Sequence, residues 1–333
     1  MAAFAPTESA AKAELPLRPS YAPSLIPAVE AFSIVVPEQL DLEQLRSSSD
    51  GLSLQQILQA MPDIQHVEYS VPSLNKNDPP VILSVFRSKS SRNTKRAVAY
   101  CLHGGAQIAC TRFTALNAVM SYFIGIDTVF VAPEYRLSPE HPAPAALQDS
   151  YAGLLWVVEH ANELGIDPSH IVIQGNSGGA PIACGTAMLC RDNKKIFPLA
   201  LMLFAPMLDD RDCTTSSKQF AHDGPWCGTI NRMAWEMVLG DKRGGSEVSE
   251  LVAPARATDL EGMPQTFIDS GDSEVFRDEA VAFASQLWKC GVQCELHVWP
   301  GAFHGFDILS SYTLLARDAV RAKSAWVQRI FSS

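Results

Sequence analysis

Apolar and polar positions alternate between two spacings along most of this chain. Short apolar runs, typical of buried strands, are followed by longer segments in which apolar residues recur at helical intervals. The pattern predicts strands at 66–72, 81–87, 97–102, 128–132, 171–174, 199–204, 265–268 and 294–299. It predicts helices at 40–45, 52–61, 145–164, 180–190, 231–239, 277–289 and 316–331.

Strands that alternate with helices predict an α/β fold, because such strands pair as parallel neighbours in a sheet that helices cover on both faces. We therefore expect a mostly parallel central sheet flanked by helices. Residues 207–255 interrupt the alternation and are polar and Gly-containing, so we interpret them as an insertion over one edge of the sheet. The N-terminal part predicts a short helical arm, with Asp50 and Ser53 as candidate helix caps.

The composition excludes several classes of protein. With 333 residues, 47% of them hydrophobic and 19% charged, the chain can bury a sizeable core and is neither disordered nor fibrous. A formal net charge of −10 disfavours nucleic acid and anionic membrane surfaces as partners. No apolar run approaches the ~18 residues of a membrane span, and no secretory signal pattern is visible. We therefore expect a cytoplasmic protein whose eight cysteines are reduced thiols.

A Gly-rich turn after the predicted strand at 171–174 supplies a candidate nucleophile. Residues 175–179 are Gly-Asn-Ser-Gly-Gly, and a predicted helix begins at once, so G-x-S-x-G stands in the strand–turn–helix context that gives it meaning. Such a turn strains the backbone of Ser177, exposes its Oγ and places it at a helix N-terminus, whose partial positive charge favours a developing anion. The alternative is an ordinary Gly-rich turn with an incidental serine.

The run His-Gly-Gly-Ala after an earlier predicted strand provides candidate donors for an oxyanion. In a glycine run, backbone N–H groups can point into a pocket without steric cost, and such groups stabilise a tetrahedral intermediate. We expect Gly104 and Gly105 to donate, with Ala106 as a further candidate. The N–H of Gly178, directly after the nucleophile, would complete the set. We interpret His103 as a structural residue that holds the loop.

A serine nucleophile needs a base to accept its proton and an acid to orient that base. With this nucleophile motif, the partners follow in the chain order acid and then His. His304 lies in a loop of small residues directly after the last predicted strand, so its ring can reach the centre of the site. His297 lies within that strand, which leaves His304 as the predicted base.

The acid should follow the preceding predicted strand, where four carboxylates crowd together. Asp269 is too near the body of the strand, and Asp278 falls in the helix that comes next. Asp272 and Glu274 remain, both on the connecting loop. Either carboxylate could hold an imidazole in the required tautomer, and spacing alone does not choose between them.

With these residues in place, the sequence resembles the hormone-sensitive-lipase-like family of α/β-hydrolases. The likeness runs from about Ala97 to the C-terminus and includes two runs beyond the motifs already described. One is Tyr-Arg-Leu-Ser-Pro-Glu-His-Pro-Ala-Pro-Ala-Ala at 135–146, and the other is Gly-Ile-Asp-Pro at 165–168. The overall look is also similar to that of fungal esterases of secondary metabolism.

The family pattern of an acid, two residues, Arg and Asp-Glu fits residues 274–279. The resemblance therefore assigns the acid to Glu274 and leaves Asp272 as the fallback. The chain departs from the family pattern at two other positions: Ala106 replaces the third glycine of the usual His-Gly-Gly-Gly, and Asn176 stands where Asp is more usual. Neither change removes a catalytic group, and both could alter specificity toward the acyl group.

The resemblance implies an α/β-hydrolase fold in a single domain over 1–333. A helical cap formed by about 1–65 and about 207–255 would lie over a catalytic core formed by about 66–206 and 256–333. Aromatic and Met side chains of the insertion are candidates to line an apolar substrate pocket, with core packing as the alternative. These candidates are Met207, Leu208, Phe220, Trp226, Met233, Trp235 and Met237.

The predicted activity is that of a serine carboxylester hydrolase that forms an acyl-enzyme and needs no metal and no other cofactor. We expect a small to medium hydrophobic ester with a short acyl group as substrate, an acetylated secondary metabolite being one candidate, and a homodimer as one candidate assembly. Acyl transfer and lactone or amide hydrolysis would use the same triad. The competing hypothesis is a non-catalytic receptor for a small ligand, like the plant gibberellin receptor, in which the catalytic His is replaced.

Overall fold

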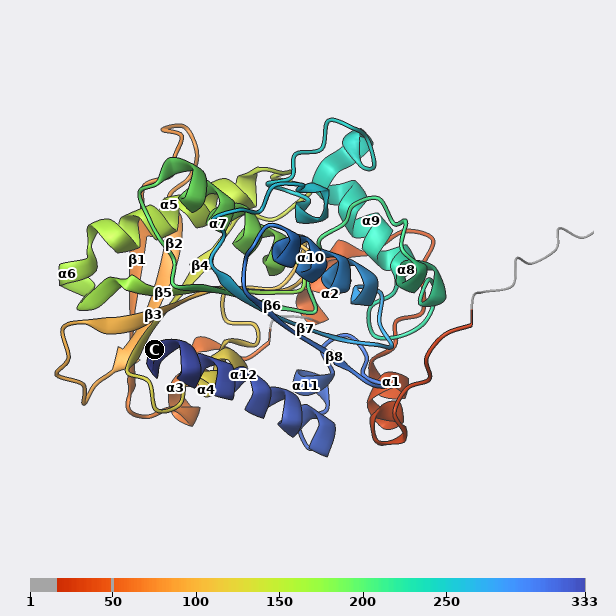
Figure 1. The fold of residues 1–333 in the computed structure, drawn as a ribbon, viewed down its shortest axis with the longest axis horizontal. Helices are drawn as coiled ribbons and strands as arrows, with labels where there is room; N and C mark the ends of the chain where they lie inside the picture. Colours follow the sequence, from red (N-terminus) through yellow and green to blue (C-terminus); the bar gives the residue numbers. More distant parts are fainter. Residues whose placement is uncertain (1–16, 49–50, 333) are drawn as a thin grey trace, which may run out of the picture.

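The computed structural model describes residues 17–48 and 51–332 of the chain. Within these residues, the strands form a single eight-stranded sheet in the order β1-β2-β4-β3-β5-β6-β7-β8 (Figure 1). They are β1 (Ile64–Val71), β2 (Val81–Ser88), β3 (Arg96–Leu102), β4 (Thr128–Glu134), β5 (Ile166–Asn176), β6 (Ala200–Phe204), β7 (Gln265–Gly271) and β8 (Cys294–Trp299). β2 is antiparallel to β1 and β4, and every other neighbouring pair is parallel. The predicted α/β fold with a mostly parallel sheet is confirmed.

Helices cover both faces of the sheet (Figure 1). One face carries α5 (Ala145–Glu159), α7 (Gly179–Asn193) and α10 (Arg277–Lys289), and the other carries α3 (Leu54–Ala60), α4 (Leu116–Tyr122) and α12 (Leu314–Ser332). Each face buries its own apolar cluster, one that includes Leu154 and Leu287 and another that includes Val119 and Trp326. This double cover explains why the parallel strands are nearly continuous apolar runs.

The predicted helices differ from the observed ones mainly where an element is short. The helix expected at 145–164 is divided at His160 into α5 and α6 (Ala161–Leu164). Helices α1 (Ile26–Phe32), α4, α8 (Thr215–Gln219) and α11 (Phe306–Leu309) were not predicted. One or two turns give too few apolar positions for a helical period to stand out. No helix within 17–48 and 51–332 is both long and apolar enough to cross a membrane.

The cap of α3 shows how one of the sequence signals works. Ser53 Oγ accepts the backbone N–H of Gln56 at 3.3 Å, and Gln56 Oε1 accepts the backbone N–H of Ser53 at 2.8 Å. This reciprocal pair satisfies two amide groups that the helix itself leaves without acceptors. Ser53 is therefore confirmed as a helix cap, whereas Asp50, the other candidate, lies outside the described residues.

Two segments, residues 17–48 and 207–255, pack against loops at the carboxyl ends of the strands, and we call them the cover segments. The second follows β6, an interior strand, so it departs from within the sheet and not from an edge strand. Its helix α9 (Gly228–Leu239) shares an apolar cluster with Leu45 of the first segment and with Ala106 after β3. The division of the chain into a cap and a catalytic core stays a prediction.

Candidate active site

The turn between β5 and α7 holds Ser177 in a left-handed backbone conformation, with a φ of 47°. A β-carbon on Gly175 would lie 2.6 Å from the carbonyl oxygen of Gly179, and one on Gly179 would overlap the carbonyl oxygen of His103. Both glycines are therefore required by close backbone packing, as the G-x-S-x-G pattern predicts. The turn lifts the side chain of Ser177 into a cavity at the carboxyl end of the sheet.

Three side chains from separate strand ends meet at this cavity. Ser177 follows β5, Glu274 lies between β7 and α10, and His304 follows β8. The Oγ of Ser177 is 3.0 Å from Nε2 of His304, and Nδ1 of the same ring is 2.7 Å from Oε2 of Glu274. Because a carboxylate can only accept, Nδ1 carries the proton and Nε2 is left to accept from the serine hydroxyl. The arrangement is that of a nucleophile, a base and an orienting acid.

Two hydrogen bonds from β7 hold the carboxylate of Glu274 on the side away from His304. It is 2% exposed, and its second oxygen, Oε1, accepts from Oγ of Ser270 at 2.5 Å and from the backbone N–H of Gly271 at 2.9 Å. The ring of Phe276 stands edge-on to the imidazole of His304, with centroids 5.1 Å apart. These contacts restrict the orientation of both the carboxylate and the imidazole.

The other three carboxylates of this region have different partners. Oδ1 of Asp272 accepts the backbone N–H of Gly301 at 2.6 Å, so it holds the turn that leads to His304. Asp269 is buried within β7, and Asp278 lies in the first turn of α10, as expected. The geometry thus places Glu274 against the imidazole and Asp272 against the backbone of Gly301.

The candidate oxyanion donors border the nucleophile. A β-carbon on Gly104 would lie 3.5 Å from Cβ of Ser177, and one on Gly178 would overlap the backbone of Ala106. Gly105 has a φ of 97°, and a β-carbon there would overlap the carbonyl oxygen of Ala109. Among the loop and cap hydrogen bonds of the described residues, none is donated by the backbone N–H of these three glycines. Their role as oxyanion donors stays a prediction.

His103 holds the loop that carries two of these glycines. Its Nδ1 is 2.7 Å from the carbonyl oxygen of Gly104, and its ring stacks on Tyr135 with centroids 4.1 Å apart. The hydroxyl of Tyr135 donates to the carbonyl oxygen of His103 at 2.8 Å. Burial lowers the pKa of His103 to about 4, so the ring is neutral near pH 7. This is the structural role that the sequence predicts.

The cavity beside the triad has a volume of about 710 Å³ and mostly apolar walls. The first cover segment contributes Phe32, Ile34 and Leu45, and the second contributes Trp226. Of the seven candidate lining residues in the insertion, Trp226 thus lines this cavity. Four others are fully buried and follow the core-packing alternative: Met207, Leu208, Phe220 and Trp235.

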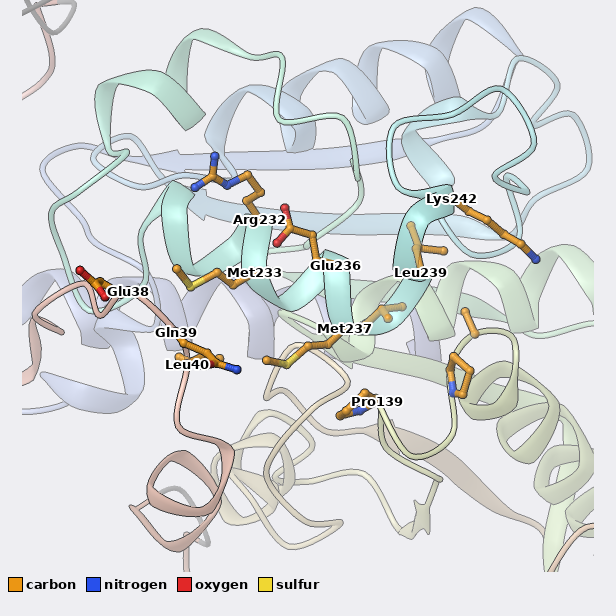
Figure 2. A pocket seen from close by; sticks show the side chains of 14 residues that line it. Glu38, Gln39, Leu40, Pro139, Arg232, Met233, Glu236, Met237, Leu239 and Lys242 are labelled. Carbon is orange, nitrogen blue, oxygen red and sulfur yellow. The ribbon is translucent and has the colours of Figure 1, made fainter.

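Met233 and Met237 instead line a separate groove of about 870 Å³. Figure 2 shows both side chains projecting from α9 toward the strip formed by Gln39 and Leu40 of the first cover segment, with Pro139 below them. The groove is lined by parts of both cover segments and holds none of the triad residues. The active-site cavity is therefore the one that contains Ser177.

Sequence reasoning missed a contact that ties the first cover segment to the site. Nε of Arg46 donates to the carbonyl oxygen of Ile108 at 2.8 Å, and its Nη2 donates to the carbonyl oxygen of Ser138 at 3.1 Å. The guanidinium also pairs with both carboxylate oxygens of Glu140 at 2.8 Å. No local pattern marks an arginine whose partners are distant in sequence, so only the fold reveals this contact.

The fold and the site define a known class of protein. The sequence profile of a family described as alpha/beta hydrolase fold matches residues 99–308, and the chain belongs to that family. The match confirms the resemblance to hormone-sensitive-lipase-like hydrolases.

Individual relatives sharpen this assignment. The chain is 30% identical over 295 residues to Carboxylesterase NlhH of Mycobacterium tuberculosis. The aligned region covers 87% of this chain and 89% of that protein. A bacterial heroin esterase has a TM-score of 0.82 at 28% identity, over 93% of this chain and 98% of its own. A fungal esterase from Rhizomucor miehei has a TM-score of 0.82 over 95% of this chain and 99% of its own, and at 24% identity it shows a shared fold alone. The protein is an enzyme, a carboxylic ester hydrolase.

Proposed function

We propose that Ser177, His304 and Glu274 form the catalytic triad of this carboxylesterase, and that its substrates are small to medium hydrophobic esters with a short acyl group. The observation that carries the proposal is the hydrogen-bond chain from Ser177 Oγ through His304 to Glu274, with distances of 3.0 and 2.7 Å. Three residues distant in sequence meet in the order that acyl transfer requires.

The geometry supports a two-step reaction. Nε2 of His304 takes the proton of Ser177 Oγ as this oxygen attacks the ester carbonyl carbon, and Glu274 stabilises the imidazolium that forms. The amides of Gly104, Gly105 and Gly178, with that of Ala106 as a further donor, stabilise the oxyanion. His304 then protonates the leaving alcohol, and an acyl ester remains on Ser177.

Water completes the cycle. His304 removes a proton from a water molecule, the resulting hydroxide attacks the acyl carbon, and the carboxylic acid leaves as Ser177 regains its proton. If an alcohol replaces water, the same steps give acyl transfer, and lactones or amides would enter through the same first step. The intact triad geometry disfavours the alternative of a non-catalytic receptor.

The cavity supports the proposed substrate class. A volume of about 710 Å³ with apolar walls suits a small or medium hydrophobic molecule. Ala106 and Asn176, the two departures from the family pattern, both line it, which supports a role for them in acyl specificity. An acetylated secondary metabolite stays a prediction for the natural substrate, as do a cytoplasmic location and a homodimeric assembly.

Turnover of p-nitrophenyl acetate, butyrate and octanoate by the wild type and by Ser177→Ala tests this function. We expect the wild type to favour the two short esters and the variant to lose activity by a factor on the order of 10⁴ or more. Ser169→Ala is the control. It changes an exposed serine in β5, the strand that leads to Ser177, and its activity should match that of the wild type. Equal turnover by Ser177→Ala would contradict the proposed nucleophile.

A further inference from the structure

A buried cluster of three charged side chains lies beside the triad. Lys323 projects from α12 and is 1% exposed. Its Nζ is 3.2 Å from Oδ2 of Asp269 and 2.5 Å from Oδ2 of Asp307, and both carboxylates border the active-site cavity. Burying three charges costs free energy that an apolar set of the same volume would avoid, so packing alone does not explain the cluster.

The two carboxylates belong to the segments that carry the acid and the base. Asp269 lies in β7 directly before Ser270, whose Oγ donates to Oε1 of Glu274 at 2.5 Å. Asp307 lies in α11, the short helix that follows His304. Lys323 therefore links the strand end that fixes the acid to the segment that carries the base.

The same ammonium also contacts the nucleophile side. Nζ of Lys323 lies 4.4 Å from the ring centroid of Phe204 at the end of β6, within the range of a cation–π interaction. The carbonyl oxygen of Phe204 accepts the backbone N–H of Ser177 at 2.8 Å. One side chain of α12 thus joins the three places in the sheet from which the triad is assembled.

The surroundings keep the cluster charged and ordered. Nε1 of Trp299 donates to Oδ2 of Asp269 at 3.1 Å, and the hydroxyl of Tyr122 donates to Oδ2 of Asp307 at 3.3 Å. Although burial opposes its charged form, the two carboxylates raise the pKa of Lys323 above its ordinary value. Burial raises the pKa of Asp269 to about 6, and the nearby ammonium opposes this rise. Without Lys323, both carboxylates would lose their only cationic partner within the described residues.

We propose that Lys323 is a positioning residue of the esterase, which holds the nucleophile, acid and base in register through Phe204, Asp269 and Asp307. This inference rests on the proposed triad. Lys323 acts through other residues and touches no reacting atom. Because a displacement of about 1 Å can cost on the order of 10²-fold in rate, its loss should lower kcat. The KM depends on the apolar cavity walls and should change little.

Two variants separate positioning from general stability. Lys323→Met removes the ammonium but keeps a long side chain, and Asp307→Asn removes only the charged link to the segment that carries the base. The matched control is Arg256→Met combined with Asp210→Asn, which removes another buried ion pair, 2.7 Å long, between a cover segment and the residues that follow it. Each protein is assayed for kcat and KM on p-nitrophenyl butyrate and for thermal unfolding. The NMR signal of the Nδ1–H of His304 is recorded without substrate.

We expect kcat to fall about 10- to 100-fold in Lys323→Met and less in Asp307→Asn, with KM within about twofold of the wild type. The downfield Nδ1–H signal should broaden or shift in both variants and stay unchanged in the control. Wild-type kcat and an unchanged signal in either folded variant would overturn the proposal. If Lys323→Met does not fold, Asp307→Asn decides by the same criteria. Since the signal needs no turnover, this result is distinguishable from failure of the proposed function, which Ser177→Ala tests.

Discussion

The strand-end loops and the cover segments enclose one cavity, but they are held in different ways. The loops are fixed by backbone contacts, such as the packing of Gly178 on Ala106 and the hydrogen bond from Ser177 N–H to the carbonyl oxygen of Phe204. In the first cover segment, Ala22 makes one such contact, from its backbone N–H to the carbonyl oxygen of Gly301 at 2.9 Å, whereas the part near Leu45 is held by side chains, notably by Arg46 and its three partners. We infer that the residues of the proposed triad depend mainly on backbone packing, so that changes in the side chains that hold the cover should disturb them less.

Replacing the proposed acid should cause the largest loss of kcat. Glu274→Gln keeps the size of the side chain but disturbs the tautomer of His304 that the serine needs, so kcat should fall on the order of 10⁴-fold. Asp272→Asn is the matched variant, because Asp272 contacts Gly301 N–H and not the imidazole. The kcat of Asp272→Asn should fall about tenfold or less. If Asp272→Asn loses far more activity than Glu274→Gln, the acid is assigned to the wrong carboxylate.

Crowding the backbone at the nucleophile should have the next largest effect. A methyl group in Gly178→Ala would overlap the backbone of Ala106 and separate the two loops, at a cost of about 10²- to 10³-fold in kcat. Gly104→Ala has room for its methyl group, 3.5 Å from Cβ of Ser177, and should lose about tenfold or less. Steady-state kinetics distinguishes the two variants, and equal losses would contradict the role of close loop packing.

The buried His103 should also make the free energy of unfolding depend on pH. Burial lowers the pKa of His103 to about 4, below the ~6.5 of an exposed histidine. The unfolded chain therefore binds more protons between these values, and the free energy of unfolding falls as pH decreases from 6.5 to 4, by about 3 kcal/mol from this group. Urea unfolding of the wild type and of His103→Gln over this range measures the difference. Equal pH dependence would refute a neutral buried imidazole.

Loosening the cover should have the smallest effect. Arg46→Met removes a half-exposed ion pair and two hydrogen bonds, so we expect a stability loss of about 1 kcal/mol. The KM should rise severalfold while kcat changes by less than about twofold, because the triad is untouched. Arg321→Met, which removes an exposed pair on α12, is the control. A large loss of kcat in Arg46→Met would mean that the cover also positions the reacting groups.

The same contrast explains what the sequence could predict. Strands and the nucleophile turn were predictable because apolar runs and glycines impose local rules, and Ser177, Glu274 and His304 follow three of those strands. Spacing left Asp272 and Glu274 equal, since the direction of a loop side chain depends on tertiary contacts. Lys323 and Arg46 escaped prediction for the same reason: a charged residue on an amphipathic helix looks solvent-exposed until its distant partners are known.

Labelling with a fluorophosphonate ester, followed by peptide mass spectrometry, tests the triad most directly. We expect one covalent adduct on the peptide that contains Ser177, none in Ser177→Ala, and labelling slowed at least 10²-fold in His304→Gln. An adduct on another residue, or labelling of His304→Gln at the wild-type rate, would contradict the assembly of Ser177, His304 and Glu274 into one catalytic unit.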